Sequence, residues 1–417
     1  MVGHYMANNI VWFRNDLRIR NNPALNAALA EGGEQSALYI LDNRNSKLGD
    51  FRRRFIAESL ADLAENLNQY NIRLQVLSGV PKEVLRTYFD SHTEYRIFAN
   101  KGYASEEKEQ EKLLQSIPRV ELCLFDDGFL LPPNCLPFDI DELPESFTAF
   151  RKKIEQVGIE SMLDASTDNL PSVIRAQSNI GIDPAHPNTA FPFRGGEYTA
   201  LERLKNYLWS SRNILTYKET RNGLLGTEYS SKFSPWLAIG CLSAQEIFFE
   251  IKTFEREVES NESTYWLIFE LLWRDYFRYV MLKYGTRLFK SGGISGKDMN
   301  LVEPSNAIDR FDAWVNGQTG DDFVDANMRE LKLTGFMSNR GRQNVASFLV
   351  HQLKLDWRRG AAYFEEQLID YDVFSNWGNW AYLAGVGNDP RENRVFNTKR
   401  QAEMYDPGGE YIRKWLD

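Results

Sequence analysis

Cysteine and histidine are scarce in this chain, which has three of the first and four of the second among 417 residues. The cysteines, Cys123, Cys135 and Cys241, include no C-x-x-C pair, so neither a disulfide framework nor a zinc cluster is expected. A reducing cytoplasm fits this pattern. The histidines are scattered along the sequence, which argues against a metal site and against acid–base catalysis by histidine.

Long apolar runs are also missing, because no stretch approaches the roughly 20 residues that span a bilayer. The first ten residues lack the basic flank and apolar run of a signal peptide. We therefore expect a soluble, cytoplasmic protein with no membrane contact. The formal net charge of −9 excludes a globally basic nucleic-acid binder. It leaves room for a local basic patch, and residues 331–360 carry more Lys and Arg than acidic residues.

The first 130 residues alternate short apolar runs with helical segments. Such runs are typical of strands buried on both faces. The predicted strands are Asn9–Phe13, Ser36–Leu41, Ile72–Leu77, Tyr95–Ala99 and Val120–Phe125. The helices predicted between them are Pro23–Ala30, Arg52–Asn68, Pro81–Asp90 and Ser105–Ile117. This order predicts an α/β domain over residues 1–130 with a doubly wound parallel sheet. No G-x-G-x-x-G follows the first strand, so the usual dinucleotide fingerprint is absent.

Two further regions follow. Residues 131–195 are rich in proline and lose periodicity after Val157, which predicts a long connector draped over the surface. A loop of such length is usually functional or poorly ordered. From residue 196 to residue 417 the amphipathic spacing is almost entirely helical. The expected architecture is an α/β domain, a connector and a larger all-α domain.

Residues 226–243 read G-T-E-Y-S-S-K-F-S-P-W-L-A-I-G-C-L-S, with hydroxyl residues and one Lys before an apolar helix. Ser234 as the N-cap and Pro235 in the first turn predict where that helix begins. Free N–H groups at a helix start, together with the hydroxyls, suit a phosphate or pyrophosphate. Simple capping explains the same residues, and for this motif alone it is the better interpretation.

The helix around Glu270 reads Y-W-L-I-F-E-L-L-W-R-D-Y-F-R. Glu270 and Arg274 are four residues apart, so they share a helix face and could form a surface ion pair. From the residues alone this pair is the simpler interpretation. The functional alternative has Glu270 and Trp273 facing a planar, hydrogen-bonding ligand.

Residues 334–382 mix the apolar spacing of a buried helix with clustered Arg, Asp, Asn and Trp. Arg342 could pair with Asp370 or Asp372. Ser338 or Asn339 could cap the helix that contains Arg342. A buried charge network explains this pattern, and so does a polar ring system bound between these groups. Many charges beside aromatic core positions predict a lined cavity.

Several longer motifs carry a family resemblance. They are V-W-F-R-N-D-L-R-I-R-N-N-P-A-L from Val11, Y-K-E-T-R-N-G from Tyr217, Y-S-S-K-F-S-P-W-L-A from Tyr229 and T-G-F-M-S-N-R-G-R-Q-N-V-A-S-F-L from Thr334. With the tail D-P-G-G-E-Y-I-R-K-W-L, the chain closely resembles the photolyase/cryptochrome family, most nearly its DASH-type branch. The resemblance covers nearly the whole chain and outweighs the simpler interpretations of the single motifs.

The resemblance implies FAD in the helical domain, folded into a U shape. The residues that match its pyrophosphate contacts are Tyr217, Ser230, Ser231, Lys232, Phe233 and Ser234. Arg274 matches a further contact, and Arg342 with Asp370 matches a salt bridge over the flavin ring. Asp372 matches a contact to the ring edge or the ribitol. Asn376 matches the residue that faces flavin N5 and tunes the ring.

Photoreduction in this family passes electrons to the flavin along a chain of Trp residues. Trp380 and Trp357 match the two inner members. The outer member is missing, because residues 303–306 contain no Trp. A different exit, through Trp314 or a Tyr, is the hypothesis that remains.

The implied substrate is a cyclobutane pyrimidine dimer, which Glu270, Trp273 and Asn339 would contact while reduced FAD donates an electron under light. Gln343 replaces a Met and Tyr382 a Trp of the duplex-repair pattern. Both changes resemble the DASH type, which prefers single-stranded DNA. The alternative function is a blue-light photoreceptor that signals through a partner. A flavoprotein oxidoreductase is a third hypothesis, but the chain lacks a nicotinamide fingerprint and an acid–base residue.

A second chromophore is implied as well. Glu142, five residues before Phe147, matches the folate-binding Glu of the family. Lys290 matches a folate neighbour in the helical domain. Methenyltetrahydrofolate is therefore the expected antenna.

The protein is expected to act as a monomer.

Overall fold

The computed structural model describes residues 8–42, 48–89, 92–163, 171–176, 185–296, 303–388 and 395–417. Its N-terminal part is a parallel sheet of five strands in the order β3-β2-β1-β4-β5. The strands are β1 (Asn8–Phe13), β2 (Gln35–Asp42), β3 (Arg73–Gly79), β4 (Tyr95–Asn100) and β5 (Val120–Phe125). The doubly wound sheet is confirmed, and the strand ends differ from the predicted ones by two residues at most.

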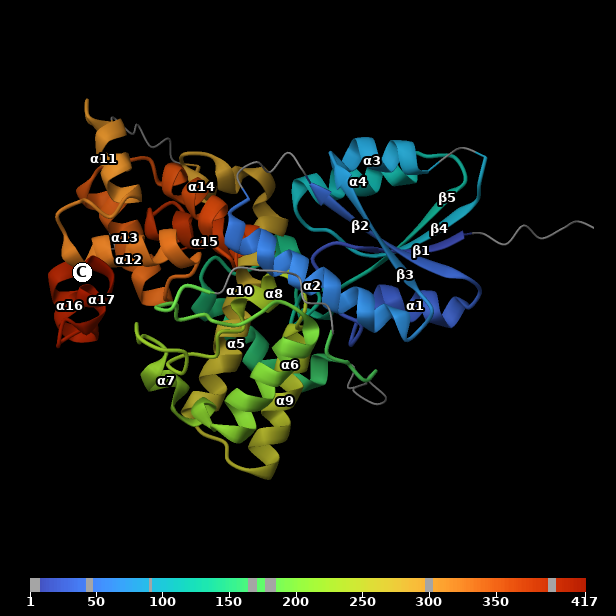
Figure 1. The fold of residues 1–417 in the computed structure, drawn as a ribbon, viewed down its shortest axis with the longest axis horizontal. Coiled ribbons are helices and arrows are strands. Elements are labelled where there is room, and N and C mark those ends of the chain that lie inside the picture. The colour runs from blue at the N-terminus through green and yellow to red at the C-terminus, as the bar shows by residue number, and fades with distance from the viewer. Residues whose placement is uncertain are drawn as a thin grey trace, which may run out of the picture.

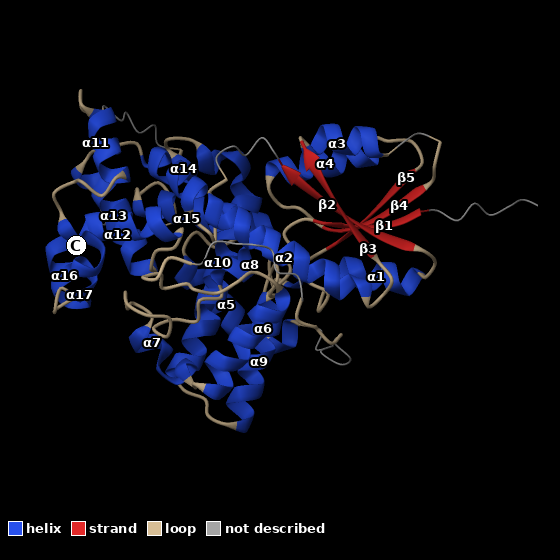
Figure 2. Cartoon of the chain, in the orientation of Figure 1, coloured by secondary structure: helices blue, strands red, loops and turns tan. Residues whose placement is uncertain are grey.

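Helices cover both faces of this sheet (Figures 1 and 2). They are α1 (Pro23–Glu31) and α2 (Asp50–Asn68) on one face, and α3 (Pro81–Tyr88) and α4 (Ser105–Gln115) on the other. Val11 and Phe13 of β1 pack towards α1 and α2, whereas Ile10 and Trp12 pack towards α3 and α4. Because neighbouring residues of a strand point to opposite faces, burial on both sides requires the continuous apolar run seen in the sequence.

The region expected to be a surface connector contains an amphipathic helix, α5 (Phe147–Val157), whose apolar face is buried. Its residues Phe147, Phe150 and Ile154 belong to the main hydrophobic core. The Phe147 ring stacks on the Trp273 ring at 3.8 Å between centroids and 12° between planes. The prediction of an irregular loop is therefore wrong for this stretch, which is helical, although most of its residues do lie at the surface. Proline frequency records where the chain turns and not what its apolar residues contact.

The rest of the described chain is helical (Figure 2). The α-helices are α6 (Glu197–Lys205), α7 (Tyr217–Thr220), α8 (Ser234–Ile239), α9 (Ala244–Glu257), α10 (Glu262–Tyr284), α11 (Ala307–Val315), α12 (Asp322–Thr334), α13 (Asn339–Ser347), α14 (Trp357–Gln367), α15 (Val373–Leu383), α16 (Thr398–Tyr405) and α17 (Glu410–Leu416). Helix α10 packs against α5, α7, α9 and α15. It therefore forms the shared wall to which the functional side chains are attached.

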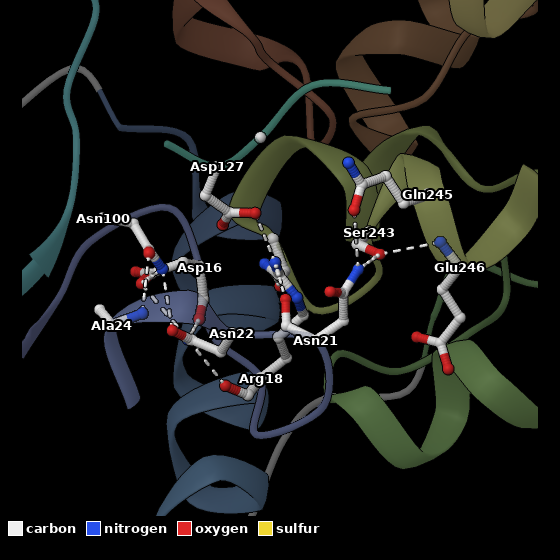
Figure 3. A network of polar contacts seen from close by, with 12 residues as sticks. Asp16, Arg18, Asn21, Asn22, Ala24, Asn100, Asp127, Ser243, Gln245 and Glu246 are labelled. Atoms are coloured by element: carbon white, nitrogen blue, oxygen red, sulfur yellow. Dashed lines mark hydrogen bonds and ion pairs between the residues drawn. The ribbon is translucent and has the colours of Figure 1, made fainter. Parts of the chain in front are cut away.

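A buried polar network joins the carboxyl edge of the sheet to the helices (Figure 3). Asn100, at the end of β4, donates to Asp16 at 2.7 Å and to Asn22 at 2.9 Å. Arg18 donates to Asp127 at 2.7 Å and to the Gly240 carbonyl, beyond α8, at 3.1 Å. Asp16 and Asn100 lie at the carboxyl ends of β1 and β4, beside the crevice where doubly wound sheets commonly bind ligands. In this chain the crevice holds the two parts of the molecule together.

Candidate cofactor and substrate site

A cavity of about 460 Å³ lies among the helices, beside α10. Its lining includes most of the residues singled out in the sequence. These are Tyr217, Ser230, Ser231, Lys232, Phe233, Ser234, Glu270, Trp273, Arg274, Asn339, Arg342, Gln343, Asp370, Asp372 and Tyr382. A smaller cavity of about 90 Å³ shares Arg342 and Asp370 and adds Asn376 and Trp380. The structure thus brings together residues that are up to about 165 positions apart in the sequence.

One wall of the cavity is made by the segment that precedes α8. The helix begins at Ser234 with Pro235 in its first turn, and no side chain caps it. The Ser234 hydroxyl donates instead to Asp370 at 2.7 Å. The prediction that Ser234 is the N-cap is therefore wrong. Asp370 lies far away in the sequence, so a local motif cannot anticipate that its carboxylate accepts the Ser234 hydroxyl.

Lys232 is the most unusual side chain in this wall. It is only 3% exposed, and its Nζ has no hydrogen-bond partner among the described residues. The ammonium lies over the Tyr229 ring, 3.2 Å from the centroid. Burial lowers the pKa of Lys232 well below its ordinary value. A buried cation without a partner is costly, so an anionic ligand group is the natural partner in a cavity that Lys232 lines.

Arg342 and Asp370 form the expected ion pair. Arg342 Nη2 donates to both carboxylate oxygens of Asp370, at 3.0 and 2.9 Å, and its Nε donates to the Met337 carbonyl. Asp372 instead pairs with Arg278 at 2.9 Å. Burial alone would raise the pKa of Asp372, but Arg278 and then Arg274 lower it. Arg278 was missed in the sequence, because nothing local connects it to a residue 94 positions away.

Glu270 and Arg274 do not pair with each other, so the simpler prediction for this helix is wrong. Glu270 pairs with Arg221 at 2.5 Å. Arg274 donates to the carbonyls of Gly128 at 2.7 Å and Leu237 at 3.1 Å. Burial raises the pKa of Glu270, and Arg221 opposes that rise. Because two backbone carbonyls accept from the Arg274 guanidinium, Glu270 is left to the cavity and to Arg221.

Aromatic rings and one amide complete the wall nearest to Glu270. Trp273 is packed between Phe147, which stacks on it, and Tyr382, whose ring lies edge-on at 5.8 Å and 84°. The Gln343 carbonyl oxygen accepts from Arg340 at 3.0 Å, so its orientation is defined. Ser338 is the cap of α13, since its hydroxyl accepts from the Gly341 amide. Asn339 is then the first residue of that helix.

Four tryptophan rings form two pairs on the helices α11, α14 and α15. The Trp380 ring is 6.2 Å from Trp314. Trp314 is fully buried and donates to the Val345 carbonyl at 3.0 Å. The Trp357 ring is 5.7 Å from Trp377, a residue that was not singled out in the sequence. Because Trp377 is only partly buried, this branch extends towards the surface.

The two predicted antenna residues lie outside both cavities. Glu142 ends the short 3-10 helix Ile140–Glu142, and Lys290 follows another, Gly285–Phe289. Both residues are exposed. Lys283, in the last turn of α10, donates to the Leu143 carbonyl at 3.1 Å, so the Glu142 segment is attached near the end of that helix. Their role in binding a chromophore stays a prediction.

Neither metal ligands nor membrane spans are found in the described part of the chain. No group of three or more His, Cys, Asp or Glu side chains there is arranged to hold a metal ion. None of the helices that the structure describes is both long and apolar enough to cross a bilayer.

Glu330 of α12 provides a test by pH. Burial raises the pKa of its carboxyl from 4.5 to about 7, although the Tyr411 hydroxyl donates to it at 2.6 Å. The folded protein then holds this proton more tightly than the unfolded chain, so the free energy of unfolding falls as pH rises from about 4.5 to 7. The part of this fall that is due to Glu330 should be on the order of 3 kcal/mol, and it should be absent in Glu330→Gln. Urea unfolding at several pH values measures it.

The exposed Glu403→Gln variant is the matched control for this titration, because its carboxyl is in water in both states. Its pH profile should coincide with that of the unchanged protein. Parallel profiles for Glu330→Gln and the unchanged protein would mean that Glu330 titrates normally in the folded state.

Taken together, the side chains of the cavity define a protein that binds an anionic, ring-containing cofactor between helices. Hydroxyls and the unpartnered Lys232 ammonium suit phosphate groups, and the Arg342–Asp370 pair with nearby amides suits a polar ring system.

Comparisons with known proteins identify this class. Residues 266–417 match the family model for the FAD binding domain of DNA photolyase, and residues 9–171 match the model for DNA photolyase. The chain therefore belongs to the photolyase/cryptochrome family. It is 45% identical to the cryptochrome DASH of Synechocystis sp., over 98% of this chain and 87% of the relative. It is 44% identical to that of Danio rerio, over 98% of this chain and 82% of the relative.

A solved structure supports the same assignment. The crystal structure of the Synechocystis sp. PCC6803 cryptochrome superimposes with a TM-score of 0.89 at 44% identity, and the match covers 99% of this chain and 89% of that chain. The α/β plus helical architecture and the DASH-type resemblance are thereby confirmed. The family model supports FAD as the cofactor. The unpartnered Lys232 ammonium and the surrounding hydroxyls fit its pyrophosphate.

Proposed function

We propose that this protein repairs cyclobutane pyrimidine dimers in light, preferentially in single-stranded DNA, by electron transfer from reduced FAD. The observation that carries this proposal is one shared cavity. Glu270 and Trp273 line the same space as Lys232, Ser234 and Asp370. A dimer bound against the first two residues would then meet the flavin directly, without intervening protein.

In this proposal FAD supplies the light-driven electron, and the side chains bind and orient. Lys232 and the serines hold the pyrophosphate, with Tyr217 and Phe233 beside it. Arg342 and Asp370 would lie at the flavin ring, Arg274 would make a further contact, and Asp372 would contact the ring edge or the ribitol. Asn376 donates its amide to the Ala361 carbonyl at 3.0 Å, which defines the orientation in which it would face the ring.

The substrate side of the cavity supports the preference for single strands. Glu270 and Asn339 would hydrogen-bond the dimer, and Trp273 would pack on it. A dimer in a duplex must leave the base stack, which costs a few kcal/mol. Gln343 and Tyr382 offer a smaller apolar wall than Met and Trp, so they compensate that cost less. This difference matters little for a strand that has no stack to leave.

Three further points belong to the same proposal. Glu142 and Lys290 would hold methenyltetrahydrofolate as an antenna. Trp380 and Trp357 would carry electrons inward to FAD. The protein would act as a monomer in the cytoplasm.

The proposal is tested with reduced protein and dimer-containing oligonucleotides, single-stranded and double-stranded, under light. We expect repair of both, with the single strand repaired faster. The FAD content is measured in the same sample by absorption. Failure to repair either strand, with reduced FAD bound, would reject the enzyme and favour the photoreceptor alternative. Equal rates on both strands would reject the single-strand preference alone.

A further inference from the structure

Trp377 of α15 connects the buried tryptophans to the surface. Its ring is 5.7 Å from that of Trp357, in a T-shaped contact, and 5.0 Å from that of Phe289. Trp357 and Trp380 are 1% and 2% exposed, whereas Trp377 is only partly buried. Of the three tryptophans Trp357, Trp377 and Trp380, Trp377 alone has direct access to solvent.

Trp380 and Trp357 both lie where α14 packs against α15. Trp380 lines the smaller cavity beside Asp370 and Asn376. Its ring lies against Gly360, where an added Cβ would come within 2.2 Å of the indole. Gly360 is one turn after Trp357 in α14, so the two tryptophans lie at the same packed junction of α14 and α15.

A proton acceptor lies at the outer end of this path. The Trp377 indole Nε1 donates to the Glu365 carboxylate at 3.2 Å. Glu365 is partly exposed, and it also hydrogen-bonds the Tyr371 hydroxyl. An indole that has lost an electron becomes a strong acid, so a carboxylate already bonded to its N–H takes the proton and hinders return of the electron.

The alternative exit through Trp314 lacks these features. Trp314 lies 6.2 Å from Trp380 but is fully buried. Its N–H donates to the Val345 carbonyl, which cannot take up a proton at neutral pH.

We propose that Trp377, with Glu365 as its proton acceptor, is the outer electron donor of the path through Trp357 and Trp380. Overall, Trp377 loses one electron to light-excited FAD, and its Nε1 proton moves to a Glu365 oxygen. This leaves a neutral indolyl radical and a carboxylic acid. A thiolate in solution then returns one electron and becomes a thiyl radical, while the proton returns from Glu365 to Nε1. The inference rests on the proposed light-driven function.

The test compares Trp377→Phe with Trp314→Phe as the matched control. Both variants keep an aromatic ring, and FAD content reports whether each folds. With a thiol present, we expect Trp377→Phe to slow light-driven reduction of the cofactor by about tenfold or more, and Trp314→Phe to change it by less than about twofold. The opposite order, or no effect of Trp377→Phe, would overturn the proposal.

Two further measurements separate electron transfer from structure. Glu365→Gln can still accept the indole hydrogen bond but not its proton, so we expect slower net reduction of the cofactor. The unchanged protein should be reduced more slowly in D2O than in H2O, and this difference should disappear in Glu365→Gln. In the dark, a bulky one-electron oxidant should mark Trp377 in the unchanged protein, as located by mass spectrometry. Any marking of the buried Trp357 in the unchanged protein should pass through Trp377, so it should fall in Trp377→Phe. Marking of Trp357 at the usual level would show that Trp377 is not its route to solvent.

Failure of this inference is distinguishable from failure of the proposed function. Trp377→Phe reduced chemically should repair dimers at the rate of the unchanged protein. If chemically reduced unchanged protein repairs nothing, the proposed function fails, while the reduction rates still decide the role of Trp377.

Discussion

Replacing Lys232 with Met is expected to weaken FAD binding and to stabilise the FAD-free protein. The ammonium is buried with no hydrogen-bond partner in the described part of the chain, and replacing buried charges with apolar side chains commonly stabilises a fold by about 1–4 kcal/mol. The pyrophosphate would lose a charge-assisted hydrogen bond, worth about 1.5–3 kcal/mol, or roughly ten- to hundredfold in affinity. FAD titration and urea unfolding of the FAD-free protein measure the two effects.

The exposed Lys332→Met is the control for this prediction, since Lys332 donates to Asn316 at the surface and does not line the cavity. It should change neither affinity nor stability. Opposite signs of the two effects at Lys232 are the informative result, because a simple packing defect lowers both. Unchanged FAD affinity in Lys232→Met would mean that this ammonium is not the partner of the pyrophosphate.

Replacing Glu270 with Gln is expected to lower repair about ten- to hundredfold while leaving FAD content nearly unchanged. The neutral amide cannot offer a charged acceptor to the dimer, and a hydrogen bond to a charged group is worth about 1.5–3 kcal/mol. Arg221, which pairs with Glu270 at 2.5 Å, would lose its counter-charge at the cavity wall. Repair per bound FAD and single-strand affinity are the measurements.

Glu262→Gln is the matched control, because Glu262 lies on the same helix and also forms an ion pair, with Lys218 at 2.7 Å. It is exposed and does not line the cavity. Repair should be unchanged in this variant. Loss of FAD in proportion to repair in Glu270→Gln would assign Glu270 a structural role only.

The strands and most helices were predictable because their signals are local. A strand buried on both faces needs an apolar run, and a core helix needs apolar residues at helical spacing, so β1 and α10 are visible in any window that contains them. The helix α5 was missed, since its burial depends on Trp273, more than a hundred residues further on. Prolines around it made the segment resemble a surface loop.

By itself, the sequence determined the main architecture, the family and many of the residues that meet in the cavity, because motifs and periodicity survive without knowledge of contacts. The Arg342–Asp370 pair was anticipated, but the tertiary structure decided the other partners. Glu270 pairs with Arg221 and not Arg274, Asp372 pairs with Arg278, and Lys232 is left with none. Ion pairing depends on distance and burial in space, and these have no counterpart in sequence spacing once the partners lie on different helices.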